Sequence, residues 1–224
     1  MYELVKNQLH AVKDELPDGV ELVAISKYHP AEAIAAAYEE GQRIFGESHE
    51  QELSRKHATL PRDIEWHFIG HLQTNKVKYI APYISMIEAA DSPKLLREIN
   101  KQALKNNRRI DVLLELHLAE EATKYGFSPE DCRRFLDGGE WREMQGVRIC
   151  GLMMMASNTD DEAQIASEFE QAHQLFKEYQ SAYFADEPCF CRRSWGMSHD
   201  YQLAVAHGSN MVRVGTRIFG ERVY

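Results

Sequence analysis

The sequence contains no apolar run near the roughly 18 residues that a membrane-spanning helix needs, so we expect no membrane partner. Basic residues are in deficit, with 26 Lys and Arg against 35 Asp and Glu. The resulting net charge of -9 argues against nucleic acid as a general partner. The four cysteines form neither a CxxC pair nor a spacing typical of metal sites. That pattern fits a reducing compartment and predicts a cytoplasmic location.

The chain also lacks internal repeats, low-complexity segments and long linkers, and its 224 residues suffice for one large domain. Short apolar runs alternate with amphipathic segments. The apolar runs predict strands at residues 21–27, 43–45, 65–69, 84–88, 111–117, 147–154, 193–197 and 211–215. The segments between them predict helices at 31–40, 50–58, 75–80, 93–106, 129–136, 161–182 and 201–206. Residues 1–16 have mixed charge and no signal-peptide character, and they predict a leading helix.

Strands that each feed a helix predict a closed parallel (β/α)8 barrel, and an open doubly wound sheet is the alternative. We expect one domain over residues 1–224, with the leading helix packed outside the barrel or across its bottom. In such a barrel, the residues that follow the strands meet at one rim. Polar residues occupy these positions after several strands, at Lys27, Ser48, His71, Asp91, Ser198 and Thr216.

Lys27 ends the first predicted strand, directly before a short turn that contains Pro30. Burial in an apolar wall disfavours the charged form of a lysine amine, and a neutral amine can attack an aldehyde. The same position also suits a lysine that only extends its ammonium group into solvent. The polar residues at the other strand ends favour the first interpretation.

A candidate phosphate site follows the last two predicted strands. Gly196-Met197-Ser198 and Gly215-Thr216 bring small residues and hydroxyl groups to the starts of the next helical segments. Glycine allows a ligand to approach the backbone closely, and N–H groups at helix starts favour anions. Loops after the seventh and eighth strands are the usual phosphate site of these barrels. Each motif alone is common in turns, but together with Lys27 they predict a phosphorylated carbonyl compound as the ligand.

Arg213 alternates with Val212 and Val214, so its side chain points away from theirs and into the barrel if the valines face the helices. An arginine in that position can form a structural ion pair with a carboxylate. If a pyridine ring occupies the site, Arg213 is instead a candidate donor to the ring nitrogen. Its permanent charge would keep the ring unprotonated and therefore a weak electron sink.

Several motifs resemble those of one family: A-I-S-K at 24–27, F-G-E at 45–47, W-H-F-I-G-H-L-Q-T-N-K at 66–76, G-L-M at 151–153, G-M-S at 196–198, M-V-R-V-G-T at 211–216 and I-F-G at 218–220. The chain resembles the pyridoxal phosphate homeostasis protein family over residues 20–224. This family is a single barrel related to the N-terminal domain of alanine racemases. The resemblance implies that pyridoxal 5′-phosphate (PLP) is the cofactor, bound as a covalent aldimine on Lys27.

The resemblance also implies the cofactor contacts. Ser198, Gly215 and Thr216 would hold the phosphate, and Arg213 would face the pyridine nitrogen. Ser48 and His71 are further candidates near the ring.

The chain departs from the family at four positions. The family usually has Asn and Tyr where Ser48 and His49 stand, Asn in place of His117, and a smaller Thr in place of Tyr28. The lysine and phosphate motifs are unchanged, so the resemblance still implies cofactor binding. The histidines at 67 and 71 flank a strand end rather than sharing a helix face, and we predict no metal site there.

Binding PLP does not by itself make an enzyme. A racemase needs acid–base groups on both faces of its substrate, and in the related racemases the second group comes from an added β-domain. Because the chain ends at Tyr224, soon after Thr216, we expect no such domain. The resemblance implies a role in PLP homeostasis and amino-acid balance through buffering or delivery of the cofactor, without robust catalysis.

The expected recipients are apo forms of PLP-dependent enzymes, and we expect a monomer or weak dimer. The alternatives are a PLP-dependent racemase or lyase of limited scope and a Schiff-base aldolase that needs no cofactor.

Overall fold

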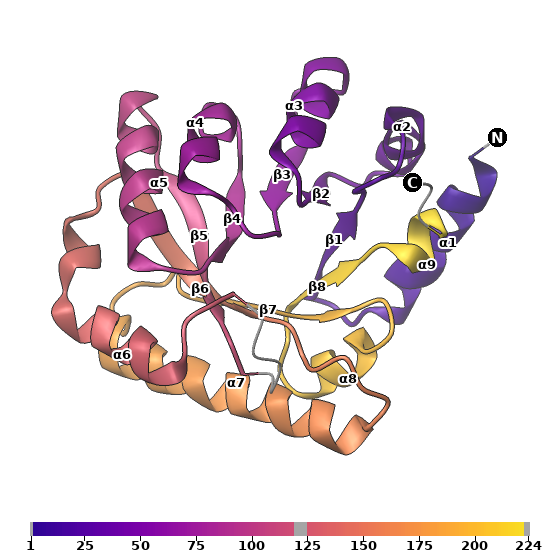
Figure 1. The fold of residues 1–224 in the computed structure, drawn as a ribbon. Helices are drawn as coiled ribbons and strands as arrows, with labels where there is room; N and C mark the ends of the chain where they lie inside the picture. The colour runs from indigo at the N-terminus through magenta and orange to yellow at the C-terminus, as the bar shows by residue number, and fades with distance from the viewer. Residues whose placement is uncertain (1, 119–124, 222–224) are drawn as a thin grey trace.

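In the computed structural model, which describes residues 2–118 and 125–221, parallel strands form one closed barrel (Figure 1). Each strand pairs with the next in chain order, and β8 pairs with β1 from Glu21↔Met211 to Ala24↔Val214. This closure confirms the predicted (β/α)8 barrel and excludes the open sheet. The strands are β1 Glu21–Ile25, β2 Ile44–Glu47, β3 Glu65–Phe68, β4 Met86–Ala90, β5 Ile110–Leu116, β6 Val147–Met154, β7 Arg192–Met197 and β8 Met211–Val214.

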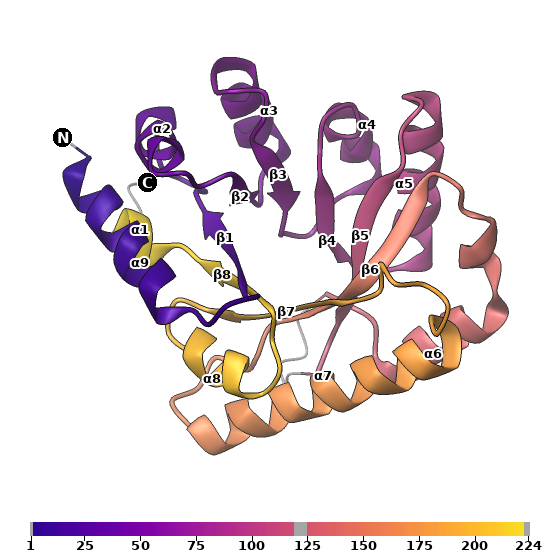
Figure 2. The ribbon, with the colours of Figure 1, turned by 180° about the vertical axis from the view of Figure 1, so that it is seen from behind.

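Helices surround the strands in both views (Figures 1 and 2). Among the described residues, none of these helices is both long and apolar enough to cross a membrane. The leading helix α1 packs outside the barrel, against α9 and α2; Met1, the first residue of its predicted range, lies outside the described residues. The helices are α1 Glu3–Glu15, α2 Ala31–Glu39, α3 Glu50–Thr59, η1 Thr74–Lys76, α4 Val77–Ile80, α5 Pro93–Lys105, α6 Pro129–Gly138, η2 Glu140–Glu143, α7 Glu162–Tyr183, α8 Tyr201–Ala206 and α9 Thr216–Phe219.

Local capping explains why the long helices begin where the sequence predicts. The Ser92 hydroxyl accepts a hydrogen bond from the Leu95 amide at the start of α5, and the Ser128 hydroxyl does the same for Asp131 at the start of α6. In both helices a proline follows the cap, where its missing N–H has no partner to lose. The sequence analysis missed η2 and α9, because segments of four residues are too short to show a helical period.

Three predicted strands were wrong by two residues at one end or both. The second strand ends at Glu47 rather than at residue 45. The fourth strand is Met86–Ala90 rather than residues 84–88, because the Ile84 amide still bonds to the Ile80 carbonyl at the end of α4. The first strand ends at Ile25 rather than at Lys27. Lys27 lies instead in a turn, closed by a hydrogen bond from the His29 amide to the Ser26 carbonyl.

The sheet separates a large outer core from a small inner one. The outer core lies between strands and helices and includes the fully buried Trp66 and Trp195. The inner hydrophobic cluster fills part of the barrel and comprises Val23, Ile25, Met86, Ala89, Leu113, Cys150, Met153 and Met211. Buried polar side chains from neighbouring strands share this interior, which is where the site described below is built.

Candidate functional site

A cavity of about 270 Å³ opens at the rim of the barrel. It brings together the predicted residues Lys27, Ser198, Arg213, Gly215 and Thr216. These residues come from the ends of the first, seventh and eighth strands, which the closed barrel makes neighbours. The rest of the lining is Ile25, His29, Ile69, Met155, Met197 and His199.

Lys27 is half-buried at the second position of the turn that spans residues 26–29. The third position is Tyr28, whose φ of 68° lies in the left-handed region. Turns with positive φ at this position favour glycine, so Tyr28 is a strained residue beside the lysine. The Tyr28 amide donates to Glu52 Oε1 of α3 at 2.7 Å. The Lys27 amine therefore projects from a turn that other elements hold in place.

Hydroxyl groups and glycine backbone form another wall of the cavity. Ser198 follows β7, and its Oγ accepts a hydrogen bond from the Gly215 amide at 3.1 Å. A Cβ atom on Gly215 would lie 3.1 Å from the Ile25 carbonyl oxygen, so a side chain there would crowd β1. Thr216 begins α9, and the N–H groups of its first two residues, Thr216 and Arg217, precede the first helical bond, which runs from the Ile218 amide to the Gly215 carbonyl. This wall offers several donors to one anionic group.

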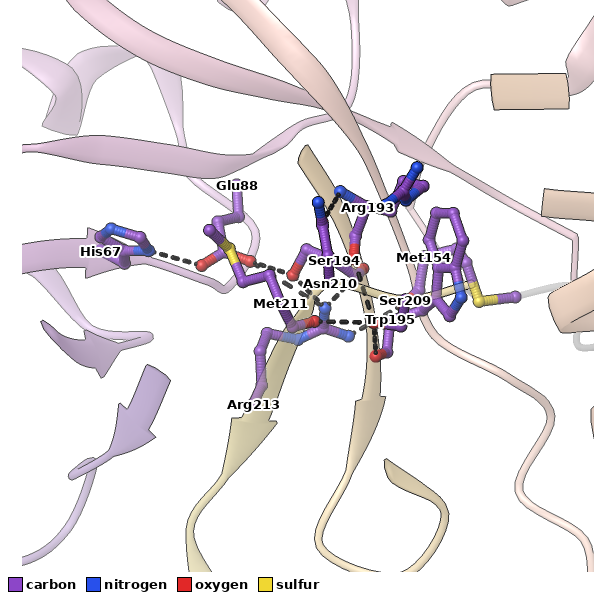
Figure 3. Close-up of polar contacts among 10 residues, drawn as sticks. All are labelled: His67, Glu88, Met154, Arg193, Ser194, Trp195, Ser209, Asn210, Met211 and Arg213. Carbon is purple, nitrogen blue, oxygen red and sulfur yellow. Dashed lines mark hydrogen bonds and ion pairs between the residues drawn. The ribbon is translucent and has the colours of Figure 1, made fainter. Parts of the chain in front are cut away.

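Arg213 lies inside the barrel, as its alternation with two valines predicts, and Figure 3 shows its contacts. Its Nη1 donates to the Ser194 carbonyl and to Ser194 Oγ, both at 2.7 Å, and its Nη2 donates to the Met154 carbonyl at 2.8 Å. Nη1 is also 3.9 Å from Glu88 Oε2. The predicted structural ion pair is therefore present. These bonds use three of the five N–H donors of Arg213, so among the described contacts the Nε–H and one Nη2–H remain for a ligand in the cavity.

Glu88 contacts several side chains of this interior network (Figure 3). Its Oε1 lies 2.7 Å from His67 Nδ1, and its Oε2 accepts from Ser194 Oγ at 2.6 Å. Complete burial raises the pKa of Glu88, but the hydrogen bond and attraction from His67, the Arg213 charge and the Ser194 bond together lower it more, so the net pKa is below its usual value. Glu88 is therefore an ionised counter-charge to Arg213.

Glu115 of β5 has the opposite electrostatic character. Burial and the nearby Asp91 charge raise its pKa to about 7, and the attraction of Arg213 only partly opposes this. Its Oε2 has no hydrogen-bond partner among the described residues. The barrel interior thus holds two glutamates whose surroundings separate their pKa values, and Glu115 can be neutral at a pH where Glu88 is charged.

Glu115→Gln should make the protein less sensitive to pH. Between about pH 4.5 and pH 7 the folded protein keeps a Glu115 proton that the unfolded chain has lost, so this carboxyl lowers the free energy of unfolding as pH rises. Glutamine removes the effect. We expect the stability of the variant relative to wild type to increase by up to about 3 kcal/mol across this window, measured by urea unfolding at several pH values. A difference that is constant with pH would contradict the assignment.

Ser48 and His71 lie outside the Lys27 cavity. They line a neighbouring cavity of about 540 Å³ on the same rim. Ser48 Oγ lies 3.1 Å from His49 Nδ1, and His71 Nδ1 lies 2.7 Å from Asp91 Oδ2. The His71 ring also stacks on Tyr125, with ring centroids 3.6 Å apart. A residue on a loop can point to either side of a strand end. The positions of Ser48 and His71 in the sequence therefore did not show which of the two cavities they line.

The sequence analysis did not identify His29, His199 or Met155 as cavity residues. Each lies within two residues of a predicted strand or of a predicted residue at a strand end. That closeness in the sequence could have indicated that they line the cavity. The roles of Glu88 and Glu115 were also missed. Each carboxyl lies in an otherwise apolar stretch of its strand, M-I-E-A-A in β4 and L-L-E-L in β5, and that isolated charge was the signal available in the sequence.

The leading helix braces the end of the chain that forms the cavity. Arg217 of α9 donates through Nη2 to Glu15 Oε1 at 2.8 Å, and through Nη1 to the Tyr201 hydroxyl at 2.7 Å. The Tyr201 hydroxyl in turn hydrogen-bonds to Glu15. Figures 1 and 2 both show α1 beside α9. Helix α1 therefore fixes the short helix that begins at Thr216.

A closed (β/α)8 barrel with a lysine at the end of β1 and hydroxyl groups after β7 and β8 defines the class of alanine racemase-like barrels. Residues 3–223 match the family model of the alanine racemase N-terminal domain. The alanine racemase of Bartonella henselae shares this fold, with a TM-score of 0.74 at 15% identity, over 99% of this chain and 59% of the racemase.

Within this class, the chain belongs to the pyridoxal phosphate homeostasis protein family, which confirms the resemblance seen in its motifs. It is 38% identical to the family member of Aquifex aeolicus, covering 91% of this chain and 87% of that protein. It is 34% identical to the member of Pasteurella multocida, covering 99% and 96%. The structure of PipY from Synechococcus elongatus with PLP bound superposes with a TM-score of 0.88 at 35% identity, over 96% of this chain and 100% of PipY.

Proposed function

We propose that this protein binds PLP through Lys27 and acts in PLP homeostasis as a reversible carrier of the cofactor. The observation that supports this most is the cavity in which a lysine amine and the hydroxyls of Ser198 and Thr216 meet the Arg213 side chain. PipY, a relative at 35% identity, has a structure with PLP bound. The proposal treats residues 1–224 as one PLP-binding domain.

The residues present fit the cofactor. PLP carries an aldehyde that exchanges reversibly between amines, and a ring that withdraws electrons when protonated. The Lys27 nitrogen would form a C=N bond with the aldehyde carbon, releasing water, and the result is a Schiff base. Ser198, Gly215 and Thr216 would hold the phosphate, and Arg213 would donate one of its remaining N–H groups to the ring nitrogen. Ser48 and His71, in the neighbouring cavity, would contribute only at the outer edge of the ring.

One feature favours carriage of the cofactor over turnover. The Arg213 guanidinium would not release its proton to the ring, so the ring nitrogen would stay unprotonated and the ring would stabilise a carbanion poorly. This feature disfavours the racemase or lyase alternative, and the family membership disfavours the aldolase that needs no cofactor.

The proposed setting is a reducing cytoplasm, which the four free cysteines support. The proposed recipients are apo forms of PLP-dependent enzymes, served by a monomer or weak dimer.

Transfer of PLP to an apoenzyme tests the proposal. Protein loaded with PLP should restore activity to an apo PLP-dependent enzyme even when a phosphatase destroys free PLP, because the bound phosphate is shielded in the cavity. Lys27→Ala should lose this protection. Ser54→Ala serves as the control and should behave as wild type, because Ser54 Oγ contacts the Tyr83 hydroxyl and Ser54 does not line the Lys27 cavity.

Two results from separate assays of the same protein would contradict the carrier role. Steady product formation from an amino acid, lost in Lys27→Ala, would support the enzyme instead. Borohydride trapping on Lys27 with a ketose phosphate, but not with PLP, would support the aldolase.

A further inference from the structure

A buried cluster of charges lies behind the turn that carries Lys27. It consists of Glu47 at the end of β2 and Glu52 and Lys56 of α3, and we call it the α3 clamp. Lys56 Nζ donates to Glu47 Oε1 and to Glu52 Oε1, both at 2.7 Å. The Lys56 and Glu47 side chains are 7% and 0% exposed. Burial raises the pKa of Glu47 to about 7, even though Lys56 and Ser26 oppose this.

A cluster of this kind is a poor source of net stability. Removing charges from water costs about as much as their attraction returns, and apolar residues of the same volume are often at least as stabilising. Buried ionic groups can instead specify one local geometry. The contacts of the α3 clamp indicate which geometry that is.

The α3 clamp holds the turn on the N-terminal side of Lys27. Lys56 Nζ donates to the Ser26 carbonyl at 2.8 Å. Ser26 Oγ donates to Glu47 Oε1 at 2.6 Å. The carbonyl and the hydroxyl of Ser26 are therefore both hydrogen-bonded to the α3 clamp. Charge-assisted hydrogen bonds of this type are short and strong.

The α3 clamp also holds the turn on the C-terminal side of Lys27. The Tyr28 amide donates to Glu52 Oε1 at 2.7 Å. Tyr28 has a φ of 68°, which a side chain disfavours, and such a conformation persists only where its surroundings fix it. Glu52 supplies that fixation directly beside Lys27.

We propose that Glu52 and Lys56 are positioning residues, which fix the turn at residues 26–29 so that the Lys27 amine is aimed into the rim cavity. This inference rests on the proposed function, in which that amine reacts with the aldehyde of PLP. Attack on a carbonyl is efficient only when the reacting atoms are held close and aligned, and a misplacement of about 1 Å can cost on the order of a hundredfold in rate.

The test compares Glu52→Ala, Glu52→Gln and Ser54→Ala. Glu52→Ala removes the acceptor for the Tyr28 amide, whereas Glu52→Gln keeps an oxygen in its place. Ser54 lies on the same helix, but its Oγ contacts the Tyr83 hydroxyl at 3.0 Å and not the turn. Each protein is freed of cofactor and mixed with PLP, and adduct formation on Lys27 is followed by stopped-flow absorbance. We expect Glu52→Ala to slow this step on the order of tenfold and the other two variants to stay close to wild type.

Hydrogen exchange of the Tyr28 amide gives a reading that needs no cofactor. It should be faster in Glu52→Ala and unchanged in Ser54→Ala. Lys56→Met, which removes the bond from Lys56 to the Ser26 carbonyl, should slow adduct formation as Glu52→Ala does. If Lys56→Met does not fold, the Glu52 variants decide the question.

Two results would overturn the positioning role. One is unchanged Tyr28 exchange in Glu52→Ala. The other is faster exchange with a wild-type rate of adduct formation. If wild-type protein forms no Lys27 adduct at all, it is the proposed function that fails, and the exchange data alone decide whether the α3 clamp holds the turn.

Discussion

Gly151→Ala should prevent the barrel from closing normally between β6 and β7. A Cβ atom on Gly151 would lie 1.8 Å from the Arg192 carbonyl oxygen and 2.9 Å from the Arg192 nitrogen, and these are backbone atoms of the neighbouring strand. Gly151 also has a φ of 152°. No side-chain movement relieves such a contact, so the strands must separate. We expect a loss of more than about 5 kcal/mol in the free energy of unfolding, measured by urea denaturation, or no folded protein at all.

Gly41→Ala is the matched control for this prediction. Gly41 has a φ of 82°, but a Cβ atom there would meet nothing within 4 Å. The substitution therefore imposes only the conformational cost of a left-handed residue, about 1 kcal/mol. If Gly151→Ala were as mild as Gly41→Ala, the close approach of β6 to β7 at Arg192 would be wrong.

Arg213→Met should have the second large effect. Methionine has a similar length, but it removes the bonds to Ser194 and Met154 and takes the Arg213 charge away from the buried Glu88, which keeps only its bonds to His67 and Ser194. Breaking a buried pair in this way costs about 3–5 kcal/mol, because the remaining charge loses its permanently charged partner. Urea unfolding at neutral pH measures the loss. PLP affinity should fall as well, because Arg213 lines the cavity.

A second substitution separates the charge from the packing. In a Glu88→Gln background, Arg213→Met should cost clearly less, because no buried carboxylate is then left alone. Arg97→Met, which breaks the exposed pair between Arg97 and Glu140, should hardly change stability. If Arg213→Met lowers the free energy of unfolding equally in both backgrounds, the ion pair with Glu88 is not the reason that Arg213 stabilises the protein.

The order of strands and long helices could be predicted from the sequence because short apolar runs alternate with amphipathic segments, and α5, α6 and α7 also begin at capping side chains. The parallel barrel then forces the strand ends together, so the meeting of Lys27, Ser198 and Thr216 followed from topology alone. No side-chain detail was needed for that part of the site. The family motifs added PLP as the proposed ligand.

The parts that could not be predicted depend on side-chain directions and on contacts distant in sequence. Residues 21–27 read as one continuous strand. The bond from the His29 amide to the Ser26 carbonyl, and the contacts of α3 with Ser26 and Tyr28, show that the strand ends before Lys27. His71 was assigned to the cofactor from its strand-end position, yet its bond to Asp91 holds it in the next cavity. These hydrogen-bonding partners lie on other helices and strands, so the pattern of neighbouring residues in the sequence does not reveal them.

Borohydride trapping of the PLP-loaded protein, followed by peptide mapping, tests the central claim most directly. The account predicts a violet absorption band that borohydride abolishes, with a phosphopyridoxyl group on the peptide containing Lys27. Lys27→Ala should show neither the band nor the modified peptide. An unchanged band in Lys27→Ala, or no band in the wild type with PLP in excess, would contradict the account and would require another ligand for this cavity.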